Sequence, residues 1–266
     1  MSIDDLSLDT STPTPARMYD YFLHGKDNFP VDRAAADSII EKLGKTVTSA
    51  VVWENRHFLG RVVRYLASEC GIDQFIDVGA GLPSQDNTHT VAQRAIPDAR
   101  VVYVDYDPVV AAHGQALLDG QGGQTKIITA DLRQPEAILD HPDTLDLIDF
   151  SRPVAVLFIA VFHFIRHSDR PQDVVAAFRE RMAPGSYVAI SHLTTDSPSA
   201  EERQLMVDTY ANTAAPIVYR SREEIEALFD GFELVPPGQV RPGLWHPDGR
   251  NGAPTERLYG AVGRKP

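Results

Sequence analysis

Residues 75–83 read F-I-D-V-G-A-G-L-P, which joins a buried-strand pattern to a glycine turn. The apolar residues before the turn suit a strand inside a sheet. Gly79 and Gly81 allow a tight turn whose backbone approaches a ligand without a Cβ in the way. A strand that runs into such a turn is typical of the nucleotide-binding corner of a doubly wound α/β fold. The simpler interpretation is a plain turn, with Asp77 capping the helix that follows.

The turn departs from the dinucleotide fingerprint G-x-G-x-x-G, because Ser84 stands where the third glycine belongs. Asp77, two residues before Gly79, would repel a pyrophosphate. It suits a ligand with positive charge, such as an amino acid ammonium or a sulfonium. The stretch therefore favours S-adenosylmethionine over NAD as the bound cofactor.

The composition is that of a soluble globular protein with a large core. The chain has 266 residues, of which 43% are hydrophobic and 23% charged. Its longest apolar run, residues 154–162, is too short to span a membrane, and the acidic N-terminus does not resemble a signal peptide. We expect a cytoplasmic protein without a membrane partner.

The net charge of −12 argues against a broad phosphate-binding surface, so a small-molecule acceptor is favoured over nucleic acid. A single cysteine, Cys70, excludes an internal disulfide and a multi-cysteine metal site. His163 and His167 have a chelating spacing, but no glutamate follows His163 as in zinc proteases, and no metal is expected. The oligomeric state stays open, with a homodimer as one option.

Strand and helix patterns alternate through five rounds, which predicts a mainly parallel sheet covered on both faces. Helical periodicity is expected over 50–68, 84–95, 108–118, 174–182, 201–214 and 222–229. Further strands are expected over 101–104, 126–129, 153–161, 187–191, 232–235 and 258–262. We predict three parts: a mobile tail over 1–14, a helical extension over 15–70 that covers the active site, and a cofactor-binding domain over 71–266.

Acids follow two of the predicted strands. Asp105 lies 24 residues past Gly81, where a strand-end carboxylate binds ribose hydroxyls in this architecture. Asp107 is the rival for this role, and Asp105 is favoured because it is closer to the strand end. Asp131 would accept a hydrogen bond from an adenine amino group, with Leu132 covering the ring. Alternatively, Asp131 caps a helix that begins near Gln134.

D-V-G-A-G-L-P, V-V-Y-V-D and A-D-L resemble the successive cofactor motifs of class I S-adenosylmethionine-dependent methyltransferases. From about residue 10 onward the chain also resembles a bacterial S-adenosyl methyltransferase family long catalogued as a domain of unknown function. The most specific stretches are residues 16–29, 54–59, 74–83, 101–108 and 232–238. His24 replaces an expected glycine and Thr14 a common asparagine, so the acceptor of this chain would differ from that of its relatives.

The resemblance implies a Rossmann-like α/β fold, with a seven-stranded sheet that ends in an antiparallel edge hairpin. It implies that Asp77 and the turn Gly79-Ala80-Gly81 hold the methionine part of S-adenosylmethionine. Asp105 would bind the ribose, and Asp131 with Leu132 the adenine. The methyl acceptor is not supplied by the resemblance.

His163 is the candidate general base, because it follows the fourth strand and the histidine pKa suits this work. Alternatively, it packs beside the cofactor and hydrogen-bonds backbone. Tyr19 or Tyr21 would place a ring or hydroxyl near the sulfonium. Residues 192–216 occupy the position of a lid. The candidate substrate-binding residues are Arg17, Tyr21, Lys26, Asn28 and Tyr210, although Arg17, Lys26 and Arg33 would equally well pair with Asp20, Asp27 and Asp32.

We therefore expect a methyltransferase that moves a methyl group by in-line displacement onto a small molecule. A non-catalytic sensor or partner subunit that binds S-adenosylmethionine or S-adenosylhomocysteine is the alternative. A short-chain NAD(P)-dependent oxidoreductase is disfavoured, because no tyrosine has lysine four residues later. A nucleic-acid methyltransferase is disfavoured by the charge and by the lack of an Asn/Asp-Pro-Pro-aromatic motif.

Overall fold

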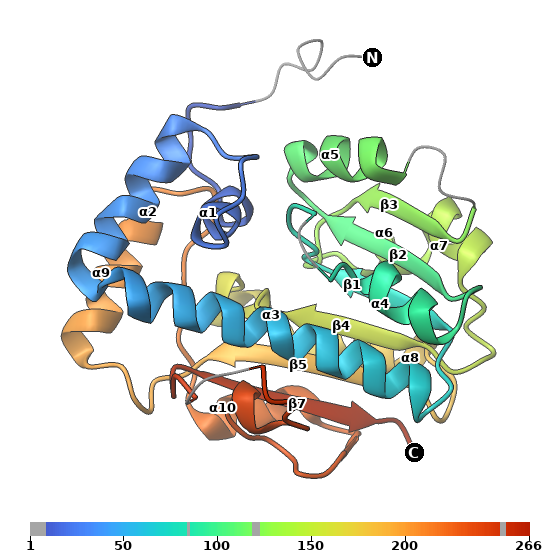
Figure 1. The fold of residues 1–266 in the computed structure, drawn as a ribbon. Helices are drawn as coiled ribbons and strands as arrows, with labels where there is room; N and C mark the ends of the chain where they lie inside the picture. The colour runs from blue at the N-terminus through green and yellow to red at the C-terminus, as the bar shows by residue number, and fades with distance from the viewer. Residues whose placement is uncertain (1–8, 84–85, 119–122, 251–253) are drawn as a thin grey trace.

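The computed structural model describes residues 9–83, 86–118, 123–250 and 254–266. Seven strands form one sheet in the order β3-β2-β1-β4-β5-β7-β6, with helices on both faces (Figure 1). The strands are β1 (Gln74–Val78), β2 (Arg100–Asp105), β3 (Thr125–Thr129), β4 (Ala155–Ile159), β5 (Tyr187–Leu193), β6 (Glu233–Leu234) and β7 (Leu258–Arg264).

Strands β1 to β5 run parallel, and β7 runs antiparallel to both of its neighbours, β5 and β6. The predicted parallel sheet with an antiparallel edge hairpin is confirmed. The chain reverses its direction of winding between β1 and β4, which lie side by side although their sequence positions are far apart. In open α/β sheets, ligands bind beyond the carboxyl ends of the strands at this point.

Two layers of helices bury the sheet. The front layer in Figure 1 consists of α3 (Lys45–Ser68), α4 (Thr88–Ala95) and α5 (Pro108–Leu118). The opposite layer consists of α6 (Pro135–Leu139), α7 (Pro142–Leu147) and α8 (Pro171–Arg181). Strand β4 is buried at every position, as expected for a central strand with helices on both sides.

A separate core lies beside the sheet, where α1 (Pro15–Phe22), α2 (Pro30–Leu43) and the first half of α3 meet α9 (Ala200–Tyr210). Met18, Ile39, Leu193 and Leu258 are among its buried residues, so this core joins the first and last parts of the sequence. Helix α10 (Arg222–Glu226) follows α9 and begins with a capping box from Ser221.

Helix α2 was not predicted from the sequence. The helix begins at Pro30, and the carboxylate of Asp32 accepts a hydrogen bond from the backbone N–H of Phe29 at its start (2.9 Å). Its apolar stripe is narrow, because Ala36 and Ile39 are the buried apolar residues. Helix α3 begins at Lys45 rather than Ala50, and α9 ends at Tyr210 rather than Ala214.

Most of the predicted mobile tail lies outside the described residues. The guanidinium group of Arg17 donates hydrogen bonds to the carbonyl oxygens of Asp9 and Thr12, and this ties the start of the described chain to α1. None of the described helices combines the length and apolarity needed to cross a membrane.

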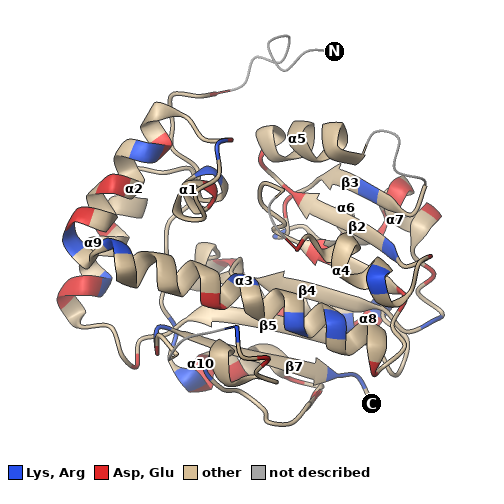
Figure 2. Cartoon of the chain, viewed as in Figure 1, with Lys and Arg blue, Asp and Glu red and all other residues tan. Residues whose placement is uncertain are grey.

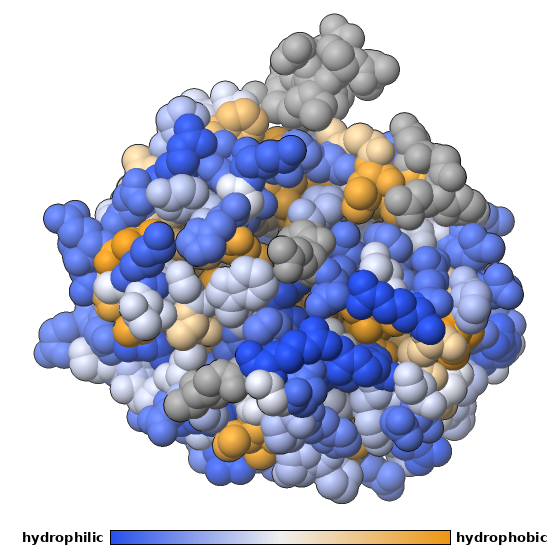
Figure 3. All heavy atoms as spheres, in the orientation of Figure 1, coloured by the Kyte–Doolittle hydropathy of each residue, from blue (hydrophilic) through white to orange (hydrophobic). Residues whose placement is uncertain are grey.

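Acidic and basic residues are interspersed over the helices visible in Figure 2. On the same side, hydrophilic residues dominate the surface and apolar ones form small separate groups (Figure 3).

Candidate functional site

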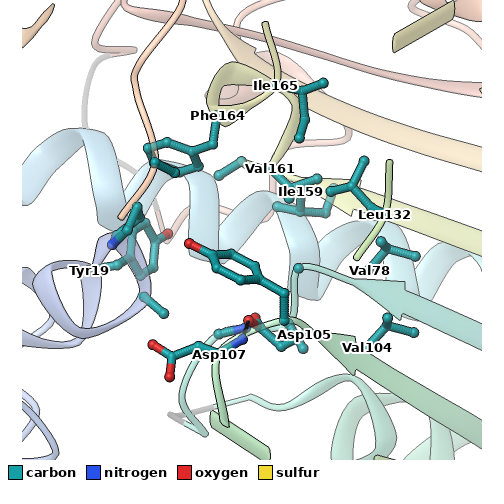
Figure 4. A pocket seen from close by; sticks show the side chains of 18 of the residues that line it. Tyr19, Val78, Val104, Asp105, Asp107, Leu132, Ile159, Val161, Phe164 and Ile165 are labelled. Atoms are coloured by element: carbon teal, nitrogen blue, oxygen red, sulfur yellow. Dashed lines mark hydrogen bonds between the residues drawn. The ribbon is translucent and has the colours of Figure 1, made fainter. Parts of the chain in front are cut away.

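A cavity of about 260 Å³ opens at the carboxyl ends of β1, β2 and β4 (Figure 4). We call it the first cavity. All seven residues predicted to bind the cofactor line it, namely Asp77, Gly79, Ala80, Gly81, Asp105, Asp131 and Leu132. The parallel register explains this convergence, because it places Asp77 beside Tyr103 of β2 and Leu157 of β4, near the ends of all three strands.

The glycine turn is fixed to β2 by its backbone. The N–H groups of Gly79 and Ala80 both donate to the carbonyl oxygen of Val104, at 2.8 and 3.1 Å. Gly79 has a φ of 74°, and a Cβ added there would lie 2.4 Å from Cγ2 of Val161. Only glycine satisfies both conditions without strain, so Val161 packs directly against the backbone of the turn.

Asp77 is a buried carboxylate at the end of β1, with 5% of its surface exposed. Its Oδ2 accepts a hydrogen bond from the hydroxyl of Thr88 (2.6 Å), not from the backbone of α4. The interpretation of Asp77 as a helix cap is therefore wrong. Burial raises the pKa of the Asp77 carboxyl, as expected for an acid held away from water.

The two acids after β2 have different partners. The carboxylate of Asp105 accepts hydrogen bonds from the N–H groups of Gly81 (2.9 Å) and Asp107 (3.0 Å), so it fastens the glycine turn to β2. Burial raises the pKa of Asp105 to about 6. Oδ1 of Asp107 accepts from the N–H of Val109 (2.9 Å), while its Oδ2 is buried and has no partner among the described residues. Asp107 thus offers a ligand the oxygen that is not already used.

The far end of the first cavity is apolar. Val78, Val104, Leu132, Ile159, Val161 and Ile165 surround it (Figure 4). Asp131 lies beside this apolar region, and hydrogen bonds from Arg133 lower the pKa of its carboxyl. The N-cap of α6 is Gln134. The N–H of Gln134 donates a hydrogen bond to the main-chain carbonyl oxygen of Asp131. The side chain of Asp131 does not cap the helix, so that alternative is wrong.

A smaller cavity of about 90 Å³, here called the second chamber, adjoins the first. The two share the lining residues Pro15, Tyr19, Asn55, Ala160 and Phe164. Most of the other lining residues of the second chamber come from α1, α2, α3, α9, β5 and β7, and the remainder come from the segments that connect such elements. The site therefore has two compartments that meet at these five residues.

A chain of hydrogen bonds runs through this junction. The N–H of Ala160 donates to Oγ of Ser191 (2.9 Å), whose hydroxyl donates to Oδ1 of Asn55 (2.5 Å). Nδ2 of Asn55 donates to the hydroxyl of Tyr19 (3.1 Å), which donates to the carbonyl of Val52 (3.0 Å). Ala160 has a φ of 56°, a strained conformation for alanine, and these bonds hold it there.

His163 lines the second chamber rather than the first cavity, and only 6% of its surface is exposed. Burial, helped by the nearby Arg220 cation, lowers the pKa of its imidazole to about 3. The expectation of a base with an ordinary histidine pKa is therefore wrong, because the ring is a weak base that stays neutral. Its Nδ1 has no hydrogen-bond partner among the described residues.

His163 does not form a metal pair with His167, whose side chain is 57% exposed and lies 3.5 Å from Glu224. The described residues contain no cluster of three or more histidine, cysteine or acidic side chains that suits a metal ion. Arg220 is fully buried and donates to the carbonyl oxygens of Phe162 (2.8 Å) and Ile165 (2.9 Å). It thereby fixes the segment after β4, which contributes to both compartments.

The four predicted substrate-binding residues of the N-terminal arm line neither compartment. Arg17 is fully buried and pairs with Asp32 (Nε to Oδ1, 3.2 Å), which is the alternative that the sequence left open. Asn28 donates to Asp20 (2.8 Å). Tyr21 donates to Asp37 (2.9 Å), and Lys26 is exposed. The side chains of Arg17, Tyr21 and Asn28 bond within the arm and Lys26 is exposed, so a role for them as substrate contacts stays a prediction without support from the two compartments.

Tyr210 and Tyr19 do line the second chamber, as do Leu193, Pro198 and Met206 of the predicted lid. The two departures from the family pattern have local explanations. His24 adopts a φ of 63°, a conformation in which glycine is normally favoured. Thr14 caps α1, because its hydroxyl accepts a hydrogen bond from the N–H of Arg17 (3.4 Å), a role that asparagine also fills.

Three residues that line the first cavity, Asn55, Arg56 and Phe164, were not predicted as site residues from the sequence. Asn55 is 3% exposed in the middle of α3. The sequence does contain a signal for Asn55, because it is a polar residue on the apolar face of an amphipathic helix. Phe164 follows β4 in an aromatic stretch that the sequence analysis considered only for His163.

The whole chain, residues 2–266, matches the family model described as S-adenosyl methyltransferase. A crystal structure of a putative methyltransferase from Thermobifida fusca is 44% identical, with a TM-score of 0.89 over 100% of this chain and 99% of the other. A DUF574 family protein from Streptomyces avermitilis is 39% identical, with a TM-score of 0.91 over 97% and 99%.

An O-methyltransferase family protein from Burkholderia thailandensis shares the fold at 13% identity, with a TM-score of 0.53 over 82% of this chain and 60% of the other. A search of curated proteins gave no match.

Proposed function

This chain belongs to the S-adenosyl methyltransferase family, and we propose that it transfers the methyl group of S-adenosylmethionine to a small-molecule acceptor at the junction of its two compartments. The observation that carries the proposal is the convergence of the glycine turn with the carboxylates of Asp105 and Asp107 in one cavity. An open second compartment touches that cavity at the junction, and it leaves room for another molecule.

The residues of the first cavity fit S-adenosylmethionine. No described atom lies within 4 Å of the position that a Cβ at Gly81 would take, so the turn is open there, and Oδ2 of Asp107 is buried without a hydrogen-bond partner among the described residues. Asp77 and the turn would hold the methionine part, where a buried carboxylate favours positive charge. Asp105 and Asp107 would hold the ribose, and Leu132 with the surrounding apolar side chains would enclose the adenine.

The cofactor supplies a methyl group on a sulfonium sulfur, which keeps the electron pair of the broken carbon–sulfur bond and becomes a neutral thioether. The protein aligns the acceptor for in-line attack and keeps water away. Tyr19, Asn55 and Phe164 would set this alignment, because they line both compartments. The helical extension, residues 15–70, would cover the site, since it contributes α1 and α3 to the junction.

A strong catalytic base is not part of the proposal. His163 is neutral and weakly basic, and the described residues that line the second chamber include no carboxylate. The acceptor would attack as a neutral heteroatom and release its proton to water after the carbon–heteroatom bond forms. Alignment and desolvation would then supply most of the rate enhancement.

Calorimetric titration tests the proposal. We expect micromolar binding of S-adenosylmethionine and S-adenosylhomocysteine, and none of NADH. Asp107→Asn is expected to weaken S-adenosylhomocysteine binding about tenfold, because the amide presents one acceptor fewer to the ribose. Binding of NADH alone would overturn the proposal. Tight cofactor binding without turnover in any cell extract would instead indicate a sensor.

Asp105 gives the same titration a pH dependence. Its carboxyl has a pKa of about 6, and we expect its ionised form to bind the cofactor. The dissociation constant for S-adenosylhomocysteine should therefore rise about tenfold per pH unit below pH 6. In Asp105→Asn, this part of the pH profile should be flat.

A further inference from the structure

We propose that the second chamber binds the apolar part of the methyl acceptor, and that the acceptor is an uncharged molecule whose buried part is about one ring in size. This inference rests on the proposed methyl transfer and adds the class of the substrate. It is carried by the position, the wall chemistry and the volume of the chamber.

The position is that of an acceptor site. The chamber and the first cavity share Tyr19, Asn55, Ala160 and Phe164, so a molecule in the chamber borders the cavity in which the cofactor is proposed to bind. Phe164 packs against Tyr210 with 5.6 Å between ring centroids, and both rings line the chamber. An aromatic or alicyclic group would extend this packing.

The wall chemistry argues for an uncharged occupant. The walls are largely apolar and include Phe22, Ile39, Val51, Leu193, Met206 and Leu258. Among the described residues that line the chamber, Arg257 alone carries a formal charge, and its guanidinium is paired with Glu202 (2.8 Å). A charged acceptor would lose its hydration shell and find no free counter-charge in exchange, which is costly.

The polar groups of the walls suit a hydroxyl or an amine. Burial raises the pKa of Tyr219 to about 12 and raises that of Tyr210 as well, so both hydroxyls stay protonated. His163 is neutral because burial lowers its pKa. These side chains therefore recognise an acceptor through neutral hydrogen bonds, which fix orientation without requiring charge.

The volume limits the size of the buried part. The chamber measures about 90 Å³. A dry cavity of roughly 150 Å³ lined by apolar side chains admits benzene. One ring, with small rearrangements of flexible side chains such as Met206, is therefore the upper limit, and the rest of the acceptor would extend toward the junction.

Ligand-observed NMR with three probes of similar size tests the charge class. Phenol, benzoate and benzylammonium are each added to the protein saturated with S-adenosylhomocysteine, which blocks the first cavity, and again to the protein alone. We expect phenol to bind at least tenfold more tightly than either charged probe. Equal or tighter binding of benzoate or benzylammonium, or no binding of phenol, would overturn the inference.

Two neighbouring residues of α9 provide matched variants. Met206 lines the chamber, whereas Val207 is 38% exposed and does not line it. Met206→Trp fills the chamber and should weaken phenol binding at least tenfold, while Val207→Trp should leave it within twofold. Retained phenol binding in Met206→Trp would refute the chamber as the site.

Both variants are expected to bind S-adenosylhomocysteine within twofold of the unmodified protein. This measurement separates the two proposals. Failure of the unmodified protein to bind S-adenosylhomocysteine counts against the proposed function. Normal S-adenosylhomocysteine binding with failed phenol binding counts against the acceptor class alone.

Discussion

The hydroxyl group of Tyr19, on α1, accepts a hydrogen bond from Nδ2 of Asn55, on α3, at 3.1 Å. Both side chains line the first cavity and the second chamber, so this contact is part of the wall that the two compartments share. Through Ser191, the same chain of bonds reaches the strained backbone of Ala160. The N-terminal arm is thereby connected to the end of β4 through Tyr19 and Asn55, which line the site, and through the buried Ser191.

Tyr19→Phe should destabilise the protein by about 1–3 kcal/mol, because it leaves the buried amide of Asn55 without its acceptor. Tyr21→Phe is the matched control on the same helix. The hydroxyl of Tyr21 bonds Asp37 at the surface, so its loss should change the free energy of unfolding by less than about 0.5 kcal/mol. Urea unfolding of both variants measures the difference, and equal losses would contradict the buried role of Tyr19.

Gly79→Ala should destabilise the protein more than Gly81→Ala. Both residues have positive φ, which costs alanine roughly 1 kcal/mol. Only the Cβ at position 79 would also overlap a side chain, that of Val161, which adds about 1–3 kcal/mol. Val161→Ala removes the overlapping methyl groups and should recover part of the loss in a double variant. A double variant whose loss equals the sum of the single losses would argue against the clash.

Arg17→Met should cost about 3–5 kcal/mol, because it leaves the buried carboxylate of Asp32 without its cation. Arg94→Met breaks an ion pair with Asp86 in which the arginine side chain is 65% exposed, and it should cost less than about 1 kcal/mol. Thermal or urea unfolding compares the two. A small effect of Arg17→Met would show that the arm contributes little to the stability of the fold.

His163 makes stability fall as the pH is lowered. Its pKa is about 3 in the folded protein and near 6.5 in the unfolded chain, so the unfolded chain binds more protons between these values. The resulting slope is at most about 1.4 kcal/mol per pH unit. His163→Phe should reduce the slope measured by urea unfolding between pH 6 and pH 5, while the buried His192 keeps its own contribution. An unchanged slope would mean that His163 is not buried as a neutral ring.

The cofactor side of the site could be predicted because it depends on local patterns. The apolar strand before Gly79 and the acid after the strand at 101–104 are visible in the sequence, and parallel pairing brings strand ends together. The separate roles of Asp105 and Asp107 could not be predicted. They depend on which carboxylate the Gly81 N–H reaches, and spacing does not show this.

The acceptor side is predictable only in part, because its walls come from distant parts of the chain. The arm residues 15–33 show many polar side chains, but the sequence does not reveal that Arg17 points inward to Asp32, or which of Tyr19 and Tyr21 faces the site. Helix α2 was missed for a related reason. Its buried stripe is narrow, since most of its surface lies outside the core.

The separate core beside the sheet also bears on the order of events during synthesis. Met18 and Ile39 pack in one cluster with Leu193, Ile217 and Leu258, which the ribosome adds much later. The first two helices can therefore pack on each other and on α3 early, but their partners from α9, β5 and β7 are made much later. The apolar surface that these later segments cover in the folded protein lacks its partners until they are synthesised. The wall of the second chamber thus closes only when the last strand has been made.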